Sequence, residues 1–197
     1  MSQSLPSSTT VLVVGAGPAG MASALSLWSS GVRDIVIVDA VEHGYGDKSS
    51  RAIVIHAATL EVRSREHSVS QTYSPYIPQK ALDLIGCADA LVERGIKVTT
   101  MNYYDRSFNL LVGVDFNGII GKTSFPFVLL LPQHITEDVL IQKLENVGIS
   151  IFRPYKAAGM RKNTKDSQLV DVSFENGQSI TAKYVIGADG SKSAVRI

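Results

Sequence analysis

Three glycines near the start of the chain have the spacing of a loop that binds the phosphates of a dinucleotide. Gly15, Gly17 and Gly20 occur in the stretch GAGPAG as the pattern Gly-x-Gly-x-x-Gly. In such a loop the first glycine makes a tight turn, the second lets the backbone approach a pyrophosphate, and the third lets a helix pack closely on a strand. Pro18 suits the first turn of that helix. Pro18 and Ala19, which begin this helix, join the candidate cofactor-binding residues, because the N-terminus of a helix attracts phosphate.

A carboxylate follows at the distance that ribose recognition requires. Asp39 lies 19 positions after Gly20 (39 − 20), at the end of a second apolar run. An acid about 20 residues after the glycines bonds a ribose hydroxyl and disfavours a 2′-phosphate, so the site suits NAD or FAD better than NADP. A glycine turn without any ligand is the alternative. The strand, helix and acid around the motif favour dinucleotide binding.

The elements that must position these residues form a β-α-β unit. Val11–Val14 is a short, fully apolar run typical of a central parallel strand. A helix with Met21, Leu25 and Trp28 on its buried face follows, and Gly31 suits its end. Residues 1–10 are polar and rich in Ser and Thr, and we expect a mobile tail there.

The rest of the chain does not continue in regular β-α alternation. The pattern predicts a helix beginning at His56, a second helical region over 81–95 and strands over 96–132. A helix over 132–148 follows, with Leu140, Ile141 and Leu144 facing inward, and then several short strands joined by an Asn-Gly hairpin turn at ENGQ.

Composition excludes several classes of function. The 197 residues carry a net charge of +1 and show no basic stripe with interleaved aromatics, which argues against nucleic acid as a partner. The single cysteine, Cys87, rules out a disulfide within the chain, and no Cys/His cluster has metal-ligand spacing. Residues 5–32 lack charge, but three glycines and a proline break the run after Val14, so we expect no membrane segment and a cytoplasmic location.

Several stretches together resemble the FAD-dependent aromatic-ring monooxygenases, the flavoprotein hydroxylases similar to p-hydroxybenzoate hydroxylase and phenol 2-monooxygenase. These stretches are VGAGPAG, Asp39, SRAIVIHAATLEV, LLLPQHITEDVL and YVIGADGSKSAVR. The likeness covers residues 11–62 and 81–197. It implies an α/β fold, in which a FAD/NAD(P)-binding Rossmann-like domain with a β-meander is joined to part of a mixed-sheet substrate domain. Residues 11–197 would then be an incomplete FAD-binding domain, and 96–132 would begin the substrate-domain strands.

The resemblance also implies further cofactor contacts. Arg51 would reach the FAD from the loop after the second strand, since a guanidinium suits phosphate and ribose oxygens. Gln133 would lie near the ribityl or flavin end. Asp189 and Gly190 match an Asp-Gly element that approaches the pyrophosphate, and Arg196 matches the arginine after it. The alternatives are a solvated loop arginine, a helix-start residue and a plain turn at the end of a strand.

In the family that the chain resembles, FAD, NAD(P)H and O₂ hydroxylate an aromatic or phenolic substrate through a flavin C4a-hydroperoxide. The protein orients the reactants and excludes water, so no catalytic triad is needed, and we assign no catalytic residue. Two other functions stay open: a different FAD-dependent oxidase or dehydrogenase, and a non-catalytic, truncated FAD-binding product. Neither the substrate nor the oligomeric state can be read from the sequence.

Two departures from the family pattern lead to expectations. A further Gly-Asp FAD element would lie beyond Ile197, so we expect the N-terminal portion of an enzyme or a truncated gene product. Such a chain, made alone, should be poorly soluble or bind FAD substoichiometrically. In addition, 63–80 interrupts a periodic region with a serine-rich and proline-containing loop, for which we hypothesise a retained intron or a lineage-specific insertion.

Overall fold

The computed structural model of the chain describes residues 4–42, 52–60, 81–190 and 193–195. It divides into two compact units. Unit 1 comprises Met1–Ser50 with Thr136–Ile197, and unit 2 comprises Arg51–Ile135. The proposed insertion 63–80 lies outside the described residues.

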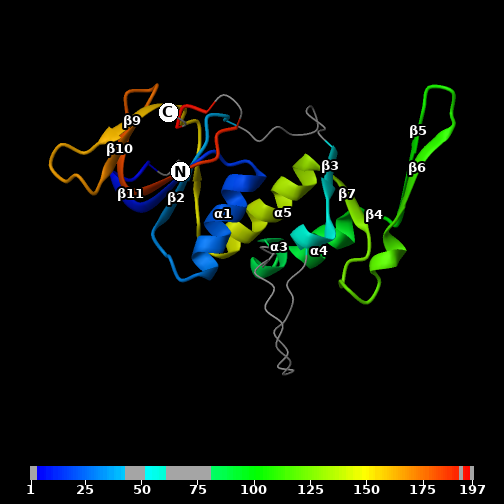
Figure 1. Cartoon of the computed structure of the whole chain (residues 1–197). Coiled ribbons are helices and arrows are strands. Elements are labelled where there is room, and N and C mark those ends of the chain that lie inside the picture. The colour runs from blue at the N-terminus through cyan, green and yellow to red at the C-terminus, as the bar shows by residue number, and fades with distance from the viewer. Residues whose placement is uncertain (1–3, 43–51, 61–80, 191–192, 196–197) are drawn as a thin grey trace. The chain divides into compact units, whose positions relative to one another are not determined.

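Unit 1 is built on a mixed six-stranded sheet (Figure 1). Its strands, in spatial order, are β8 (Ile151–Phe152), β2 (Ile35–Val38), β1 (Ser8–Val14), β11 (Ser179–Gly187), β10 (Val170–Phe174) and β9 (Ala157–Lys162). The first four strands run parallel, whereas β10 pairs antiparallel with both β9 and β11. The α/β class, with a Rossmann-like parallel half and a β-meander, is therefore confirmed.

The central parallel strands form because their residues are apolar on both faces. Val11–Val14 and all of β2 are buried. Helix α1 (Pro18–Ser29) connects them and buries Met21 and Leu25, as its spacing predicts. Trp28, which was also expected on the buried face, is only half-buried. The helix ends before Gly31, whose φ of 98° is a conformation that glycine adopts without steric cost.

Strand β1 begins at Ser8, within the segment expected to be a tail. The side chain of Asp34 explains the longer strand, because its carboxylate accepts hydrogen bonds from the Thr9 hydroxyl (3.0 Å) and from the Thr10 backbone N–H (2.7 Å). Burial raises the pKa of Asp34, but the hydrogen bonds from Thr10 and Thr9 outweigh it and hold the pKa below its ordinary value. Pairing of Ser8 with Thr181 of β11 completes this extension.

Most of helix α5 (Gln133–Asn146), from Thr136 onward, and the meander complete unit 1. In α5 the residues Val139, Leu140 and Leu144 are buried, and Ile141, which was expected to face inward, is only half-buried. The Asn-Gly hairpin prediction is confirmed, since Gly177 between β10 and β11 has a φ of 81°. The parallel strands and the meander share a hydrophobic core that includes Leu12, Val38, Val172, Phe174 and Ile180.

Unit 2 contains a three-stranded antiparallel sheet in the order β3 (Ala52–Ile55), β7 (Val128–Pro132) and β4 (Ile96–Val98). Three short helices, α2 (Ala57–Leu60), α3 (Ala81–Leu84) and α4 (Ala88–Arg94), belong to the same unit. The prediction of a single helical region over 81–95 is wrong in one respect. It is broken between α3 and α4, where Gly86 adopts a φ of 66° and Cys87 is buried.

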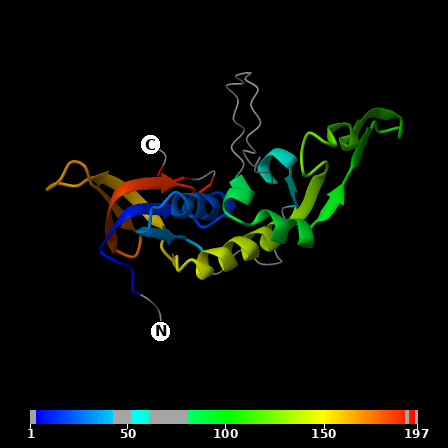
Figure 2. The same ribbon diagram turned by 90° about the horizontal axis from the view of Figure 1, so that it is seen from below.

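A two-stranded ribbon forms the rest of unit 2. Strands β5 (Thr100–Tyr104) and β6 (Leu110–Asp115) pair antiparallel, and a 3₁₀ turn over Phe116–Ile119 leads away from them. Figures 1 and 2 both show the ribbon, in green, extending away from the three-stranded sheet of the same unit. Among the residues that the structure describes, no helix is long and apolar enough to cross a membrane.

Candidate functional site

The candidate site lies where the carboxyl ends of β1, β2 and β11 meet. The backbone N–H of Gly15, directly after β1, donates to the carbonyl of Val38 at 2.8 Å, and the N–H of Ala188, directly after β11, donates to the carbonyl of Val14 at 2.7 Å. In open α/β sheets ligands bind outside the carboxyl ends of the parallel strands. The fold therefore brings the glycine turn, Asp39 after β2 and the Asp-Gly element after β11 to one edge of unit 1.

Two of the three glycines are required by close packing within the protein. A Cβ on Gly15 would overlap the carbonyl oxygen of Ala188, and Gly15 has a φ of 107°. A Cβ on Gly20 would overlap the carbonyl oxygen of Gly15 and lie 3.2 Å from the Cβ of Ala188. Backbone atoms therefore make the closest contacts where the turn after β1 meets the first turn of α1 and the end of β11.

Gly17 has a different surrounding. It precedes α1 with a φ of −75°, which any residue adopts, and a Cβ at this position would meet no atom of the described residues within 4 Å, apart from its chain neighbours. No side chain caps the N-terminus of α1, and no acidic residue stands in the first turn of this helix. Since the first amides of a helix have no partner within it, they remain available to an anion at this end.

Asp39, directly after β2, holds the glycine turn in place. One carboxylate oxygen accepts a hydrogen bond from the N–H of Ala16 at 2.6 Å, and the other accepts from the N–H of Val41 at 2.8 Å. A carboxylate has about four acceptor positions, so each oxygen keeps one for a ribose hydroxyl. The bond to Ala16 is a structural role that sequence spacing did not reveal.

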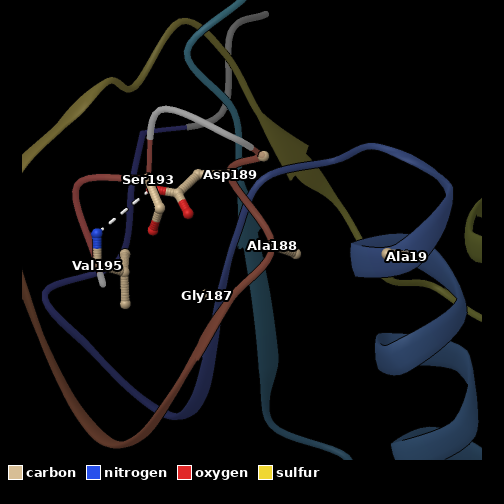
Figure 3. Close-up of a pocket in the computed structure, with 7 residues that line it drawn as sticks. Ala19, Gly187, Ala188, Asp189, Ser193 and Val195 are labelled. Carbon is tan, nitrogen blue, oxygen red and sulfur yellow. Dashed lines mark hydrogen bonds between the residues drawn. The ribbon is translucent and has the colours of Figure 1, made fainter. Parts of the chain in front are cut away.

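An open cavity of about 550 Å³ lies between α1 and the segment that follows β11 (Figure 3). Ala19, from the first turn of α1, faces it from one side. The other lining residues come from the end of β11 and beyond it: Gly187, Ala188, Asp189, Gly190, Ser193 and Val195. Ala19, Asp189 and Gly190 were predicted from the sequence, and the structure brings them together.

The carboxylate of Asp189 is turned toward its own segment of the chain, as Figure 3 shows. It accepts hydrogen bonds from the N–H of Ala194 at 2.7 Å and, more weakly, from the N–H of Val195 at 3.3 Å. Burial raises the pKa of Asp189, but the hydrogen bonds from Ser193, Ala194 and Val195 outweigh it and leave the pKa below the ordinary value. Asp189 is thus ionised at neutral pH and fixes the loop that forms one wall of the cavity.

The remaining predicted residues are Pro18, Gln133, Arg51 and Arg196. Pro18 occupies the first turn of α1, as expected. Gln133 is the first residue of α5 and belongs to unit 2, whereas the glycine turn belongs to unit 1. Arg51 and Arg196 lie outside the described residues.

Sequence reasoning missed Ala188, Ser193 and Val195. The Cβ of Ala188 lies 3.2 Å from the place that a Cβ on Gly20 would take, so Ala188 adds to the close packing around this glycine. The other two help to close the Asp189 turn, and a Cβ on Gly187 would lie 2.9 Å from Val195. The only signal for them is the short polar stretch GADGSKS, which is typical of a turn stabilised by an Asp side chain.

The donors and acceptors of this edge fit a dinucleotide. Uncapped helix amides and the open space at Gly17 suit a diphosphate, and the carboxylate of Asp39 suits a ribose hydroxyl.

Comparison with known proteins gives the same family. Residues 8–197 match the model of the FAD binding domain family. An aromatic compound monooxygenase of Bacillus subtilis is 30% identical over 190 residues, which are 94% of this chain and 32% of that protein. Pentachlorophenol 4-monooxygenase of Sphingobium chlorophenolicum is 29% identical over 94% of this chain and 30% of its own length. The chain thus spans about a third of the length of the curated relatives it matches.

Solved structures share the fold. A p-nitrophenol 4-monooxygenase of Pseudomonas putida superposes with a TM-score of 0.69 at 24% identity, over 91% of this chain and 40% of that one. An anhydrotetracycline hydroxylase of Streptomyces rimosus gives a TM-score of 0.72 at 23% identity, over 96% of this chain and 33% of that one. A flavin-dependent monooxygenase solved with FAD and substrate gives a TM-score of 0.69 at 20% identity, over 95% of this chain and 31% of that one.

Proposed function

Since this chain belongs to the FAD binding domain family, we propose that unit 1 binds FAD and serves a monooxygenase that hydroxylates an aromatic substrate with NAD(P)H and O₂. One observation carries the proposal for this chain's own residues. The N-terminus of α1 has neither a side-chain cap nor an acid in its first turn, and no described residue beyond its chain neighbours lies within 4 Å of a Cβ built on Gly17. A diphosphate can therefore approach the backbone here.

The described residues divide the work of binding. The amides at the start of α1 would hold the pyrophosphate, and Asp39 would accept a hydrogen bond from the adenosine ribose while it keeps the glycine turn in place. Asp189 fixes the loop whose Gly190 lines the cavity beside Ala19. Arg51, Gln133 and Arg196 are proposed as further FAD contacts by the resemblance alone.

Bound FAD would supply the redox chemistry that activates O₂, because no amino-acid side chain provides it. The protein contributes orientation and exclusion of water. The aromatic substrate and the use of NAD(P)H rest on relatives such as the pentachlorophenol and p-nitrophenol 4-monooxygenases, which are named for aromatic substrates. As part of the same proposal, the strands of 96–132 belong to the substrate-binding side of such an enzyme.

Titration of the purified chain with FAD, followed by the quenching of flavin fluorescence, tests the first part of the proposal. Saturable binding is the expected result, and a chain that leaves FAD fluorescence unchanged at all concentrations refutes it. The second part requires the complete enzyme. There, NAD(P)H oxidation and O₂ uptake should both rise when a phenol is added. Flavin reduction that responds to another class of substrate, without O₂ incorporation, would instead favour an oxidase or dehydrogenase.

A further inference from the structure

Both backbone polar groups of Asp39 are held by the connection between β8 and β9. The N–H of Asp39 donates to the carbonyl of Phe152, the last residue of β8, at 3.0 Å. The carbonyl of Asp39 accepts from the N–H of Tyr155, inside the connection, at 2.6 Å. Strand β2 ends at Val38, so these two bonds fix the backbone of an acid that stands just beyond the strand.

The ring of Tyr155 anchors the connection to the meander. It lies edge-on to the ring of Phe174 in β10, with the ring centroids 5.3 Å apart and the ring planes at 74°. Phe174 is buried in the core that the parallel strands and the meander share, and Tyr155 packs against the same core. An edge-to-face pair prefers one mutual orientation, so the contact restricts where the backbone of Tyr155 can lie.

A second contact ties the connection to the end of β10. The N–H of Glu175 donates to the carbonyl of Lys156 at 2.9 Å, and the side chains of the two residues form an ion pair at 2.8 Å. More than half of each of these side chains is exposed, so the ion pair itself adds little. The backbone of 155–156 is thus joined to Asp39 on one side and to the end of β10 on the other.

The place of Asp39 matters because its carboxylate works within narrow limits. It already accepts from the N–H groups of Ala16 and Val41, and the ribose hydroxyl proposed to bind it would have to come within about 3 Å of a carboxylate oxygen. Groups that bind a ligand in this way must be held to about 0.5 Å by the residues behind them. Among the described residues, Phe152 and Tyr155 make the backbone bonds that hold Asp39.

We propose that Tyr155 is a positioning residue for the cofactor. Its ring, in contact with Phe174, sets the place of its own backbone N–H, and that N–H holds Asp39 where the carboxylate meets the 2′-hydroxyl of the adenosine ribose. The inference rests on the proposed function, because it concerns the same FAD site. The competing role for Tyr155 is packing alone, which would affect the stability of unit 1 and the binding of every nucleotide alike.

Competition between two nucleotides tests the positioning role. FAD binding to the chain is followed by the quenching of flavin fluorescence, and ADP or 2′-deoxy-ADP is then added to displace the FAD. The wild-type chain should bind ADP about tenfold more tightly than 2′-deoxy-ADP, because only ADP offers the 2′-hydroxyl to Asp39. In Tyr155→Ala this preference should nearly disappear, and FAD should bind more weakly than it does to wild type.

Two control variants separate positioning from packing. Tyr155→Phe keeps the ring and should keep the wild-type preference for ADP. Val172→Ala removes apolar volume from the same core, at a fully buried position of β10, and should lower the melting temperature without changing the preference. Tyr155→Leu keeps apolar volume without the planar ring, is measured beside Tyr155→Ala so that a folded variant is available, and should also lose the preference.

The outcomes are distinguishable. Loss of the preference in Val172→Ala or in Tyr155→Phe, or a wild-type preference retained in Tyr155→Leu and Tyr155→Ala, would overturn the positioning role. A wild-type chain that binds FAD but does not distinguish the two nucleotides would overturn it as well, and in all these cases FAD binding itself still stands. A wild-type chain that leaves flavin fluorescence unchanged refutes the proposed function and this inference together.

Discussion

The three glycines of the turn are needed for different physical reasons. Gly15 and Gly20 are fixed by contacts inside the protein, whereas Gly17 borders open space. The glycine motif therefore combines a packing requirement with the binding role proposed for Gly17, and substitutions can separate the two.

Gly17→Ala should leave folding unchanged but weaken FAD binding. Alanine adopts the φ of −75° at this position and meets no atom of the protein, so the melting temperature should stay within the error of measurement. The added methyl group would occupy the approach of the pyrophosphate, and we expect at least about tenfold weaker binding, roughly 1.4 kcal/mol. Flavin fluorescence titration measures this effect.

Gly20→Ala is the contrasting variant. Its Cβ would overlap the Gly15 carbonyl, so the free energy of unfolding should fall by about 1–3 kcal/mol, the usual cost of overpacking. Thermal melts of both variants without FAD decide between the two roles. A Gly17→Ala protein that melts as early as Gly20→Ala would show that Gly17 is also a packing residue.

The pKa of Asp189 predicts how the loop after β11 responds to acid. Its folded-state pKa is lowered, so the stabilisation it gives is complete above the unfolded-state value of about 3.9 and is lost as pH falls through the lower folded-state value. The free-energy difference between wild type and Asp189→Asn should therefore be constant from neutral pH down to about pH 5, and shrink below about pH 4. Urea unfolding at a series of pH values measures this difference. A difference that instead disappears near pH 6 would contradict the assignment.

At the scale of elements, β1 is central to unit 1, since it pairs with β2 on one side and β11 on the other. Leu12, in its middle, is fully buried. Leu12→Ala should lower the free energy of unfolding by about 2–5 kcal/mol through the lost transfer energy and the cavity left behind. Leu111→Ala, at a 67% exposed position of β6, should change it by less than about 0.5 kcal/mol. Urea unfolding followed by far-UV circular dichroism compares the two, and equal effects would show that Leu12 is not in the core.

The hydrophobic pattern and the glycine spacing predicted those strands and turns whose formation has one dominant physical cause. The β-branched runs at Val11–Val14 and Ile35–Val38 could only be buried strands, and the glycine turn between them followed from spacing. The break at Gly86 was missed because the apolar period continues across it, and a positive φ is not visible in hydrophobic pattern. The early start of β1 depended on Asp34, which is distant in sequence from Thr10.

The candidate site was predictable to a similar extent. Spacing identified Gly15, Gly17, Gly20 and Asp39, because the turn and the acid belong to one local β-α-β unit. The bond from Ala16 to Asp39 and the inward turn of Asp189 depend on the pairing of β1, β2 and β11, which no short stretch encodes. Ala188 carries no polar group, so its role could be seen only from its contact with the glycines.

At the scale of the whole molecule, a small net charge and an exposed apolar ribbon act together. The net charge is +1 and the sequence pI is about 7.8, so charge repulsion between copies is weakest near that pH. Solubility of the chain should therefore be lowest near its pI and rise toward pH 6, where the charge is more positive. Precipitation with polyethylene glycol across this pH range measures the trend.

The double variant Tyr103→Thr/Val112→Thr in the β5–β6 ribbon separates the contributions of charge and of exposed apolar surface to solubility. It leaves the charge unchanged and replaces two exposed apolar side chains, so it should raise solubility at every pH without moving the minimum. A solubility that is independent of pH in the wild type would show that charge has little part in it.

The close packing of Gly15, Gly20 and Ala188 has an evolutionary consequence. A Cβ on Gly15 would overlap the backbone of Ala188, and a Cβ on Gly20 would overlap the backbone of Gly15, so a side chain at either glycine is tolerated only where the backbone shifts. The end of β11 lies far along the chain from the glycine motif, yet its backbone path should change in step with the first glycine. In an alignment of many relatives, loss of Gly15 should coincide with a change of length or sequence directly after β11. Chains that lose this glycine and keep the segment after β11 unchanged should be rare.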